Sequence, residues 1–432
     1  MYKKLIIICL FPLLFVACGL LTPDIEKKVP LRSNQKAFAK EDMYIIFALR
    51  AEQIRDHKSA SELFNILYEK STKKEYLYRS LENDLVRKAN KEVIQRVDAL
   101  TQGSLEDHKL IRYKVVALVA EQKFLEAQNL ALQLIQSSPE IDDYILVSDI
   151  YIQRKEFETA LKYLESAYIK NYSEEVLDRM AIVLYVNLHK TKEAIAQLET
   201  HTRVHGCSER ICNRLIGFYS NENNIDGLLS TYLRLYSLSN NEEIAKKIVQ
   251  IYGYKKEYLK LIDFLEHSYK DEDTLLQLYS VTKNYKKAYP LADKLYEQTR
   301  DPHYLGQSAI YEYESQDKSL DKKVLSSVIE KLQRVTQEDK SPIYLNYLGY
   351  ILIDHDVDVK KGMQYIHEVL KVQPNSSFYL DSLAWGYYKM GNCKKAKDVM
   401  NKVMTLEGSD EPEVLLHLKK INQCIKTSKG KK

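Results

Sequence analysis

The chain has 432 residues, 64 basic and 60 acidic side chains, and only 13 glycines and 9 prolines. This composition favours long helices over a many-stranded sheet, and the balanced charge lacks the basic stripe of a nucleic-acid-binding surface. Tyrosine is abundant, with 33 residues against 10 phenylalanines and one tryptophan. A tyrosine ring packs between helices while its hydroxyl reaches water or a polar partner.

The N-terminal residues have the pattern of an export signal. A cationic start at residues 1–4 precedes an apolar run of 12 residues, Leu5 to Val16. The run is too short to cross a bilayer, since about 20 residues are needed for that. It has the proportions of a secretory signal peptide.

The residues that follow, Leu-Phe-Val-Ala-Cys-Gly at 14–19, resemble the lipobox of bacterial lipoproteins. The resemblance implies cleavage before Cys18 and attachment of a diacylglyceryl group to its thiol, with palmitate among the acyl chains. Because Gly19 is not Asp, the resemblance favours the outer membrane, with the anchored chain facing the periplasm. In the alternative interpretation, the segment is an ordinary signal peptide and Cys18 carries no lipid.

Beyond this leader, a small or aliphatic residue returns about every 34 positions, each time in a helix that follows a turn. A fixed period in this range indicates stacked units that bury their apolar faces against one another. The period loosens after the first seven positions and recovers near the C-terminus. The positions are Ala60, Val93, Ala127, Ala160, Ala194, Gly227, Leu261, Ala288, Val324, Gly362 and Ala396.

The best-formed unit covers residues 144–167. Its apolar residues have helical spacing up to Tyr151, a polar turn follows, and a second amphipathic helix begins at Phe157. This unit resembles a tetratricopeptide repeat, with Ser148 and Ala160 in the small positions where the two helices meet. The segments 345–350 and 380–388 resemble the terminal repeats of proteobacterial tetratricopeptide lipoproteins.

The resemblance implies an all-α, right-handed superhelical solenoid of antiparallel helix pairs, with ten or eleven repeats and a capping helix from Glu413 to Ile425. We expect six segments along the chain. They are a signal peptide at 1–17, the lipidated cysteine and a flexible tether at 18–40, N-terminal repeats at 41–205, degenerate repeats at 206–340, well-formed repeats at 341–410, and the capping helix with a basic tail at 411–432.

Besides Cys18, four cysteines remain in the mature chain, where export exposes them to an oxidising compartment. Cys393 is expected to begin the second helix of the last repeat and Cys424 to end the capping helix. Because these helices should run antiparallel, both thiols return to nearly the same height at about 1.5 Å per residue. We therefore expect a disulfide between them.

Cys207 and Cys212 leave three alternatives open. Inside one helix they would point to different faces, but Cys207 follows Gly206 and could lie in the preceding loop, within reach of Cys212. His201 and His205 stand one turn apart just upstream, so the cluster also supplies the ligand types of a zinc site. A disulfide, no bond at all, and a metal site are the alternatives.

In tetratricopeptide arrays the first helix of each repeat lines a groove that binds peptides, helices or domains. Lys and Asn, which the carboxylate-clamp variant of the family needs there, are mostly missing, so we exclude that ligand. The projected surface instead suits an amphipathic helix or an apolar segment, although aliphatic residues on first helices also pack between repeats. The projected residues are Val116, Ile145, Asp149, Ile152, Arg179, Val183, Ile216, Tyr219, Asn346, Tyr350, Ile353, Asp381, Trp385 and Tyr388.

The sequence contains no phosphate-binding glycine loop, nucleophile elbow or metalloprotease motif, so we expect neither an enzyme nor a cofactor. The hypothesis is a lipid-anchored scaffold or adaptor for proteins of the cell envelope. A self-assembling component of an envelope complex and, less favoured, a chaperone for exported clients are the alternatives. Architecture alone does not choose among them.

Overall fold

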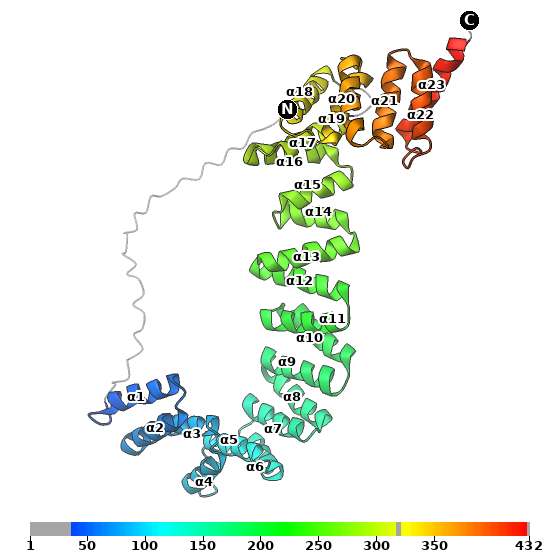
Figure 1. Cartoon of the computed structure of the whole chain (residues 1–432). Helices are drawn as coiled ribbons and strands as arrows, with labels where there is room; N and C mark the ends of the chain where they lie inside the picture. Colours follow the sequence, from blue (N-terminus) through cyan, green and yellow to red (C-terminus); the bar gives the residue numbers. More distant parts are fainter. Residues whose placement is uncertain (1–35, 317–320, 430–432) are drawn as a thin grey trace, which may run out of the picture. The chain divides into compact units, whose positions relative to one another are not determined.

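A computed structural model describes residues 36–316 and 321–429, and over these ranges the chain is all-α. Cys18, the tether up to residue 35 and the last three residues lie outside the described residues. The chain divides into two compact units at residues 218 and 219, and each unit is described by itself. Figure 1 labels the helices of both.

From residue 36 onwards, the first unit contains ten helices, one π-helical segment that continues α9, and most of α11, which includes the boundary residues. Their bounds are α1 Glu41–Gln53, α2 His57–Ser71, α3 Lys74–Val86, α4 Asn90–Thr101, α5 His108–Ala120, α6 Phe124–Ser137, α7 Ile141–Gln153, α8 Phe157–Asn171, α9 Glu174–Ile182, η1 Val183–Asn187, α10 Thr191–His205 and α11 Glu209–Asn221.

The second unit continues the same pattern from α12 to the last helix. The bounds are α12 Ile225–Ser239, α13 Glu242–Lys255, α14 Tyr258–His267, α15 Glu272–Val281, α16 Tyr285–Thr299, α17 Pro302–Glu314, α18 Lys322–Glu338, α19 Pro342–Asp354, α20 Val359–Val372, α21 Ser377–Lys389, α22 Cys393–Val403 and α23 Pro412–Lys429.

Within each unit, consecutive helices reverse direction through short turns and pack against each other (Figure 1). The described helices form eleven pairs followed by α23, so the predicted ten or eleven repeats and the capping helix are confirmed. The capping helix is longer than expected, because it starts at Pro412 and continues to Lys429. The degenerate stretch is built from the same helix pairs.

The repeat period has a simple physical basis in the second helices. In α8, the residues Ala160, Leu164 and Ala167 are fully buried, and their i, i+4, i+7 spacing places them on one helix face. Small side chains on this face let the first helix of the pair approach closely.

The same spacing corrects the predicted position of one repeat. In α18 the fully or almost fully buried residues are Val328, Leu332 and Val335, whereas Val324 is only half-buried. α18 begins six residues before Val328, whereas α16 begins three residues before Ala288, so its packing residue comes one turn later than the sequence analysis placed it. From Val328 to Gly362 the step is again 34.

Two glycines show how closely paired helices approach. A Cβ added at Gly362 in α20 would lie 2.6 Å from the backbone oxygen of Gly349 in α19, and one added at Gly349 would lie 2.9 Å from the oxygen of Gly362. Neither position has room for a side chain, because a facing backbone oxygen and an isoleucine side chain both lie within 2.9 Å of the added Cβ. The two helices therefore cross at a glycine–glycine contact.

Tyrosine hydroxyls link neighbouring repeats, which explains much of the high tyrosine content. Tyr76 in α3 donates to Oε1 of Glu41 in α1 at 2.8 Å, and Tyr78 donates to Asp107, the residue before α5, at 3.0 Å. The donor and acceptor of these two hydrogen bonds are 35 and 29 residues apart in the sequence, which is close to the length of one repeat. Ring burial and hydroxyl donation thus act together at successive first helices.

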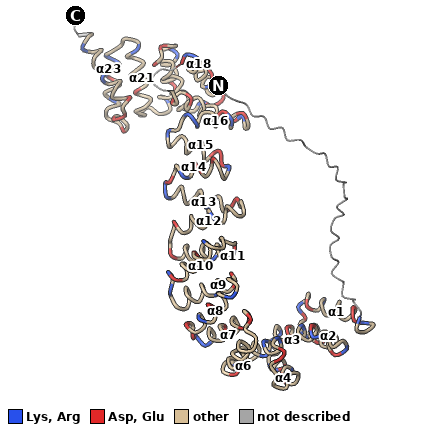
Figure 2. Tube along the Cα trace, turned by 180° about the vertical axis from the view of Figure 1, so that it is seen from behind, with Lys and Arg blue, Asp and Glu red and all other residues tan. Residues whose placement is uncertain are grey.

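Ion pairs make the same connection between first helices. Arg112 in α5 donates from Nε to Oδ1 of Asp143 in α7 at 2.7 Å and from Nη2 to Oδ2 at 2.9 Å. Asp143 is fully buried, and a bidentate guanidinium is the partner that a buried carboxylate needs. Figure 2 shows basic and acidic residues interspersed along the helices of each unit.

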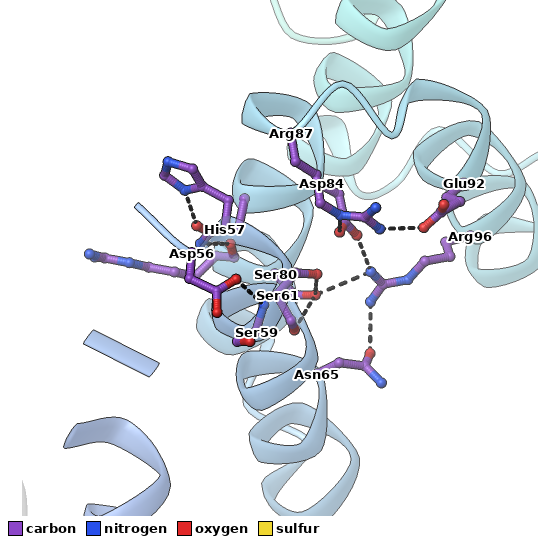
Figure 3. A network of polar contacts seen from close by, with 12 residues as sticks. Asp56, His57, Ser59, Ser61, Asn65, Ser80, Asp84, Arg87, Glu92 and Arg96 are labelled. Atoms are coloured by element: carbon purple, nitrogen blue, oxygen red, sulfur yellow. Dashed lines mark hydrogen bonds and ion pairs between the residues drawn. The ribbon is translucent and has the colours of Figure 1, made fainter. Parts of the chain in front are cut away.

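A polar network joins α2, α3 and α4 near the N-terminal end of the described chain (Figure 3). Asp84 is buried, and it accepts hydrogen bonds from Nη1 of Arg96 at 2.6 Å and from Nε of Arg87 at 3.0 Å. The hydroxyls of Ser61 and Ser80 lie 3.0 Å apart between α2 and α3. Short polar side chains take the role here that alanines have in other pairs.

Two disulfides occur in the structure. Cys393, the first residue of α22, is bonded to Cys424 in α23, with Cα atoms 5.7 Å apart. Cys207 lies in the loop before α11 and is bonded to Cys212 in that helix, with Cα atoms 5.5 Å apart. The loop position brings the second pair together, because the chain has not yet entered the helix at Cys207.

Candidate functional site

The structure corrects the predicted groove at five of its residues, because their side chains are buried. Exposure is 3% for Val183, 7% for Tyr219, 0% for Ile353, 6% for Asp381 and 4% for Trp385. Helical projection put these residues on a partner-facing surface, but their side chains are covered, and of the five only Asp381 lines the cavity described below. Val116 is exposed; those that remain half-buried are Ile145, Asp149, Ile152, Arg179, Ile216, Asn346, Tyr350 and Tyr388.

Trp385 is the clearest correction. Its ring stacks between the rings of Tyr388 and His417, with centroids 4.6 and 4.0 Å away, and its Nε1 donates to Oδ1 of Asp354 at 2.8 Å. The indole therefore fastens α23 and α19 to α21. It is part of the packing of the capping helix and does not offer a surface to a partner.

In the first unit, Asp149 is the polar member of the predicted surface. Burial raises the pKa of its carboxyl, although Nη1 of Arg179 lies 3.0 Å from Oδ1 and favours the charged form. Ile145 and Ile152 lie half-buried on the same helix, α7. This cluster is an ion pair between neighbouring repeats with apolar flanks.

The second unit contains a more developed cavity, which we call the tyrosine–carboxylate pocket. Its volume is about 680 Å³, and its walls come from three successive first helices, α17, α19 and α21, and from the start of α23. The lining residues are Tyr313, Glu314, Ile343, Asn346, Tyr347, Tyr350, Gln373, Ser376, Phe378, Tyr379, Asp381, Ser382, Glu411, Pro412, Glu413 and Val414.

Tyrosine hydroxyls hold two of the pocket carboxylates. Tyr350 donates to Oε1 of Glu413, and Tyr347 donates to Oε1 of Glu314 at 3.3 Å. Burial raises the pKa of both hydroxyls, so they remain protonated donors at neutral pH. The pocket thereby keeps its carboxylates in defined positions without a basic residue among its lining residues.

The environment of Glu314 shows the electrostatic character of the pocket. Solvent reaches this side chain, but the surrounding walls desolvate it and raise the pKa of its carboxyl, and the negative charge of Glu413 acts in the same direction. The hydrogen bond from Tyr347 and the charge of Lys283 oppose the shift. A positive group in the pocket would stabilise the charged form of Glu314.

Two oxygen atoms of the pocket residues are buried without a hydrogen-bond partner. They are Oδ1 of Asn346 and Oδ1 of Asp381. Both residues take the fifth position of their helices, α19 and α21. The other carboxylate oxygen of Asp381 lies 2.8 Å from Nδ1 of His417 in α23. Buried acceptors are normally satisfied, so this pair indicates a place for a donor.

Sequence reasoning projected three of the pocket residues onto the groove, namely Asn346, Tyr350 and Asp381. It missed Tyr347, because the residue was read only as part of the repeat signature at 345–350. It also missed Glu413, which was taken as the first residue of the capping helix. Asn346 and Asp381 are 35 residues apart in the sequence, and this spacing was the signal that they take equivalent positions on α19 and α21.

The histidine pair near the first disulfide is occupied by packing. Nδ1 of His201 lies 2.8 Å from the hydroxyl of Tyr168, and the rings of His201 and His205 lie 4.7 Å apart. Over residues 36–316 and 321–429, no group of three or more His, Cys, Asp or Glu is arranged to hold a metal ion. None of the helices in these ranges is long and apolar enough to span a bilayer.

Neither a protein-family model nor a curated protein matches this chain. Among solved structures, yeast Tom70 is 12% identical over 90% of this chain and 97% of its own, with a TM-score of 0.33. A tetratricopeptide repeat protein from Parabacteroides merdae is 14% identical over 57% and 98%, with a TM-score of 0.26.

A third similar structure is Naa15/Naa10 bound to HypK-THB, with 11% identity and a TM-score of 0.28. The match covers 86% of the present chain and spans 64% of that chain. Because all three TM-scores lie below 0.5, the fold assignment depends on the helix pairs themselves.

Proposed function

We propose that this chain, whose fold is an array of tetratricopeptide-type helix pairs, is a scaffold that binds another protein through the tyrosine–carboxylate pocket. The observation that carries the proposal is the composition of the pocket walls. Three successive first helices and the capping helix contribute to one cavity, and two of its lining residues, Asn346 and Asp381, carry buried acceptors without partners. Its role would be binding rather than catalysis.

The rim of the pocket favours a protein as the ligand. Phe378 and Ile343 are 59% and 49% exposed beside the polar interior. Apolar residues around a polar centre suit a peptide segment, whose flanking side chains cover the rim while one side chain enters the cavity. A small polar ligand would leave both apolar residues in water.

The proposed location is the periplasmic face of the outer membrane, with the chain anchored by lipid on Cys18. The lipobox-like sequence at 14–19 supports this location. Metabolic labelling with an alkyne fatty acid tests it. We expect label on the wild-type chain and none on the Cys18→Ala variant, and equal labelling of both would exclude Cys18 as the acceptor.

Site-specific photo-crosslinking in cells tests the scaffold function. A photoreactive phenylalanine replaces Phe378 at the pocket rim or, as the control, Tyr254 in α13, which is 78% exposed. We expect one discrete heterologous adduct from position 378 that is missing from position 254. No adduct, or the same adduct from both positions, would contradict a partner site at the pocket.

A second candidate function is self-assembly, and the exposed surface of α1 favours it. Met43, Ile46, Phe47 and Leu49 in this helix are all at least 40% exposed, and clustered apolar residues at a surface often mark an interface. Light scattering after size exclusion separates the two functions. A monomer at all concentrations would rule out self-assembly, and a defined oligomer that the Phe47→Lys variant dissociates would support it.

A further inference from the structure

We infer that the tyrosine–carboxylate pocket recognises a lysine or arginine side chain on an extended segment of a partner protein. The inference rests on the proposed scaffold function and specifies the chemistry of its partner. It reverses the charge preference of the carboxylate-clamp variant, which was excluded above.

The charge of the pocket points to a cation. Four carboxylates line it, from Glu314, Asp381, Glu411 and Glu413, and none of the lining residues is Lys, Arg or His. By contrast, Asp293 elsewhere in the second unit is paired with Lys331 at 2.9 Å. The charge of Lys283 offsets part of this negative charge at Glu314, and the acidic lining of the concave site attracts a positive group and repels an anionic one.

Asp381 supplies an independent observation. The residue is 94% buried, and its Oδ1 is an acceptor without a partner. His417 holds the other oxygen at 2.8 Å, so the free acceptor has a fixed direction. A buried carboxylate oxygen is costly to leave without a donor, and a basic side chain would supply both the donor and the opposite charge.

Asn346 extends the same acceptor site. Its Oδ1 is also buried without a partner, and it occupies the equivalent position one pair earlier. An ammonium group has three donors and a guanidinium has five, so either can satisfy more than one acceptor together. The two acceptors on neighbouring helices thus match the multiple donors of a basic side chain.

The aromatic walls favour the same ligand. Tyr313, Tyr347, Tyr350 and Tyr379 line the pocket, and cations bind favourably to the faces of such rings. The aliphatic part of a lysine or arginine packs against ring carbons while its charged end reaches the carboxylates. No other type of side chain combines these properties with an obligatory positive charge.

Direct binding to the full mature chain tests the inference. The probe is a fluorescent peptide of serine residues with a central Leu-Lys-Leu, and the matched control carries Leu-Gln-Leu. We expect the lysine peptide to bind at least about tenfold more tightly, which corresponds to about 1.4 kcal/mol, and to weaken with salt. Equal binding of the two peptides, or no binding of the lysine peptide, would overturn the inference.

Three variants assign the binding to the pocket. Asp381→Asn removes the buried charge, and because it also alters the contact with His417, Glu314→Gln and Glu413→Gln provide two changes at more exposed carboxylates. Asp263→Asn, at a side chain that is 80% exposed in α14, is the control. Each pocket variant should weaken the lysine peptide at least about threefold with an unchanged melting temperature for the two exposed sites. Wild-type affinity in both Glu variants would overturn the assignment.

The basic tail of the chain itself provides an alternative occupant. Residues 426–432 read Lys-Thr-Ser-Lys-Gly-Lys-Lys, and deletion of this segment distinguishes the sources. Unchanged affinity after deletion supports a partner segment. Tighter peptide binding after deletion would mean that the tail occupies the pocket, which would overturn the assignment to a partner.

Failure of this inference is distinguishable from failure of the scaffold function. A discrete adduct at position 378, together with no preference for the lysine peptide, leaves the scaffold and removes cation recognition. A lysine preference without any protein adduct keeps cation recognition and removes the proposed scaffold function.

Discussion

Replacement of Gly362 by alanine should destabilise the C-terminal repeats. The added Cβ would lie 2.6 Å from the oxygen of Gly349 and 2.7 Å from Cγ1 of Ile353. Optimal carbon contacts lie at about 3.5–4.0 Å, so α19 and α20 must separate by several tenths of an ångström or more. Overpacking of this kind costs about 1–3 kcal/mol, and alanine recovers about 0.5–1 kcal/mol of helix propensity.

The net expectation from these two terms is a loss of about 1 kcal/mol, within a range of about 0–2.5 kcal/mol. Trp385, the only tryptophan of the chain, packs in the same cluster as Ile353 and Met363. Its fluorescence during urea unfolding therefore reports on the affected repeats. We expect the midpoint of this transition to fall in the Gly362→Ala variant.

Gly253 in α13 is the matched control, because a Cβ there meets no atom within 4 Å. Gly253→Ala should stabilise α13 by about 0.5–1 kcal/mol, measured as slower hydrogen exchange of that helix. A Gly362→Ala chain that is as stable as the wild type, or more stable, would refute the argument that backbone contact requires glycine at this crossing.

Three further predictions concern a disulfide, a buried ion pair and pH. The Cys393→Ser, Cys424→Ser double variant opens a loop of 31 residues and should lower the free energy of unfolding by about 3–4 kcal/mol on the chain-entropy account. An unchanged midpoint of urea unfolding, followed by Trp385 fluorescence, would contradict a stabilising bond. Asp143→Asn leaves Arg112 without its buried carboxylate and should lower the stability of the first unit by about 3 kcal/mol. Hydrogen exchange in α5 and α7 measures this loss, and a loss of stability below about 1 kcal/mol would mean that the pair behaves as a surface ion pair. Burial of Glu41 disfavours its charged form, but hydrogen bonds to the carboxylate outweigh burial and lower the pKa of the carboxyl below 4.5. The contribution of Glu41 to stability is therefore present above pH 4.5 and disappears as the pH falls through the lowered pKa. Hydrogen exchange in α1 should therefore depend less on pH in Glu41→Gln than in the wild type, and identical pH profiles would contradict this.

The fold was predictable because one packing rule repeats along the chain. Ala160 and its equivalents bury a small face at a step of 33 or 34 residues as far as Leu261, but the step is 27 to Ala288 and 40 to Val328 before it returns to 34. The error at Val324 arose because α18 begins six residues before its packing position Val328, whereas α16 begins three residues before Ala288. Periodicity alone does not reveal an insertion that preserves helical phase.

The pocket was less predictable, because its walls do not follow the repeat. Asn346 and Asp381 are equivalent in sequence, but Glu413 comes from the capping helix, whose position depends on the chain reversal after α22. Trp385 was expected at the surface because it lies on a first helix, yet α23 covers it through His417. Which part of a first helix remains open depends on this last helix, whose placement the repeat pattern does not specify.

The most direct measurement of the central claim is calorimetric titration of the partner segment identified by crosslinking at position 378. The titration uses the wild-type chain, the Glu314→Gln, Glu413→Gln double variant and the Asp263→Asn control. We predict binding to the wild type and the control with equal affinity, and a loss of at least about tenfold, or about 1.4 kcal/mol, in the double variant. Equal affinity of all three chains for that segment would contradict recognition through the tyrosine–carboxylate pocket.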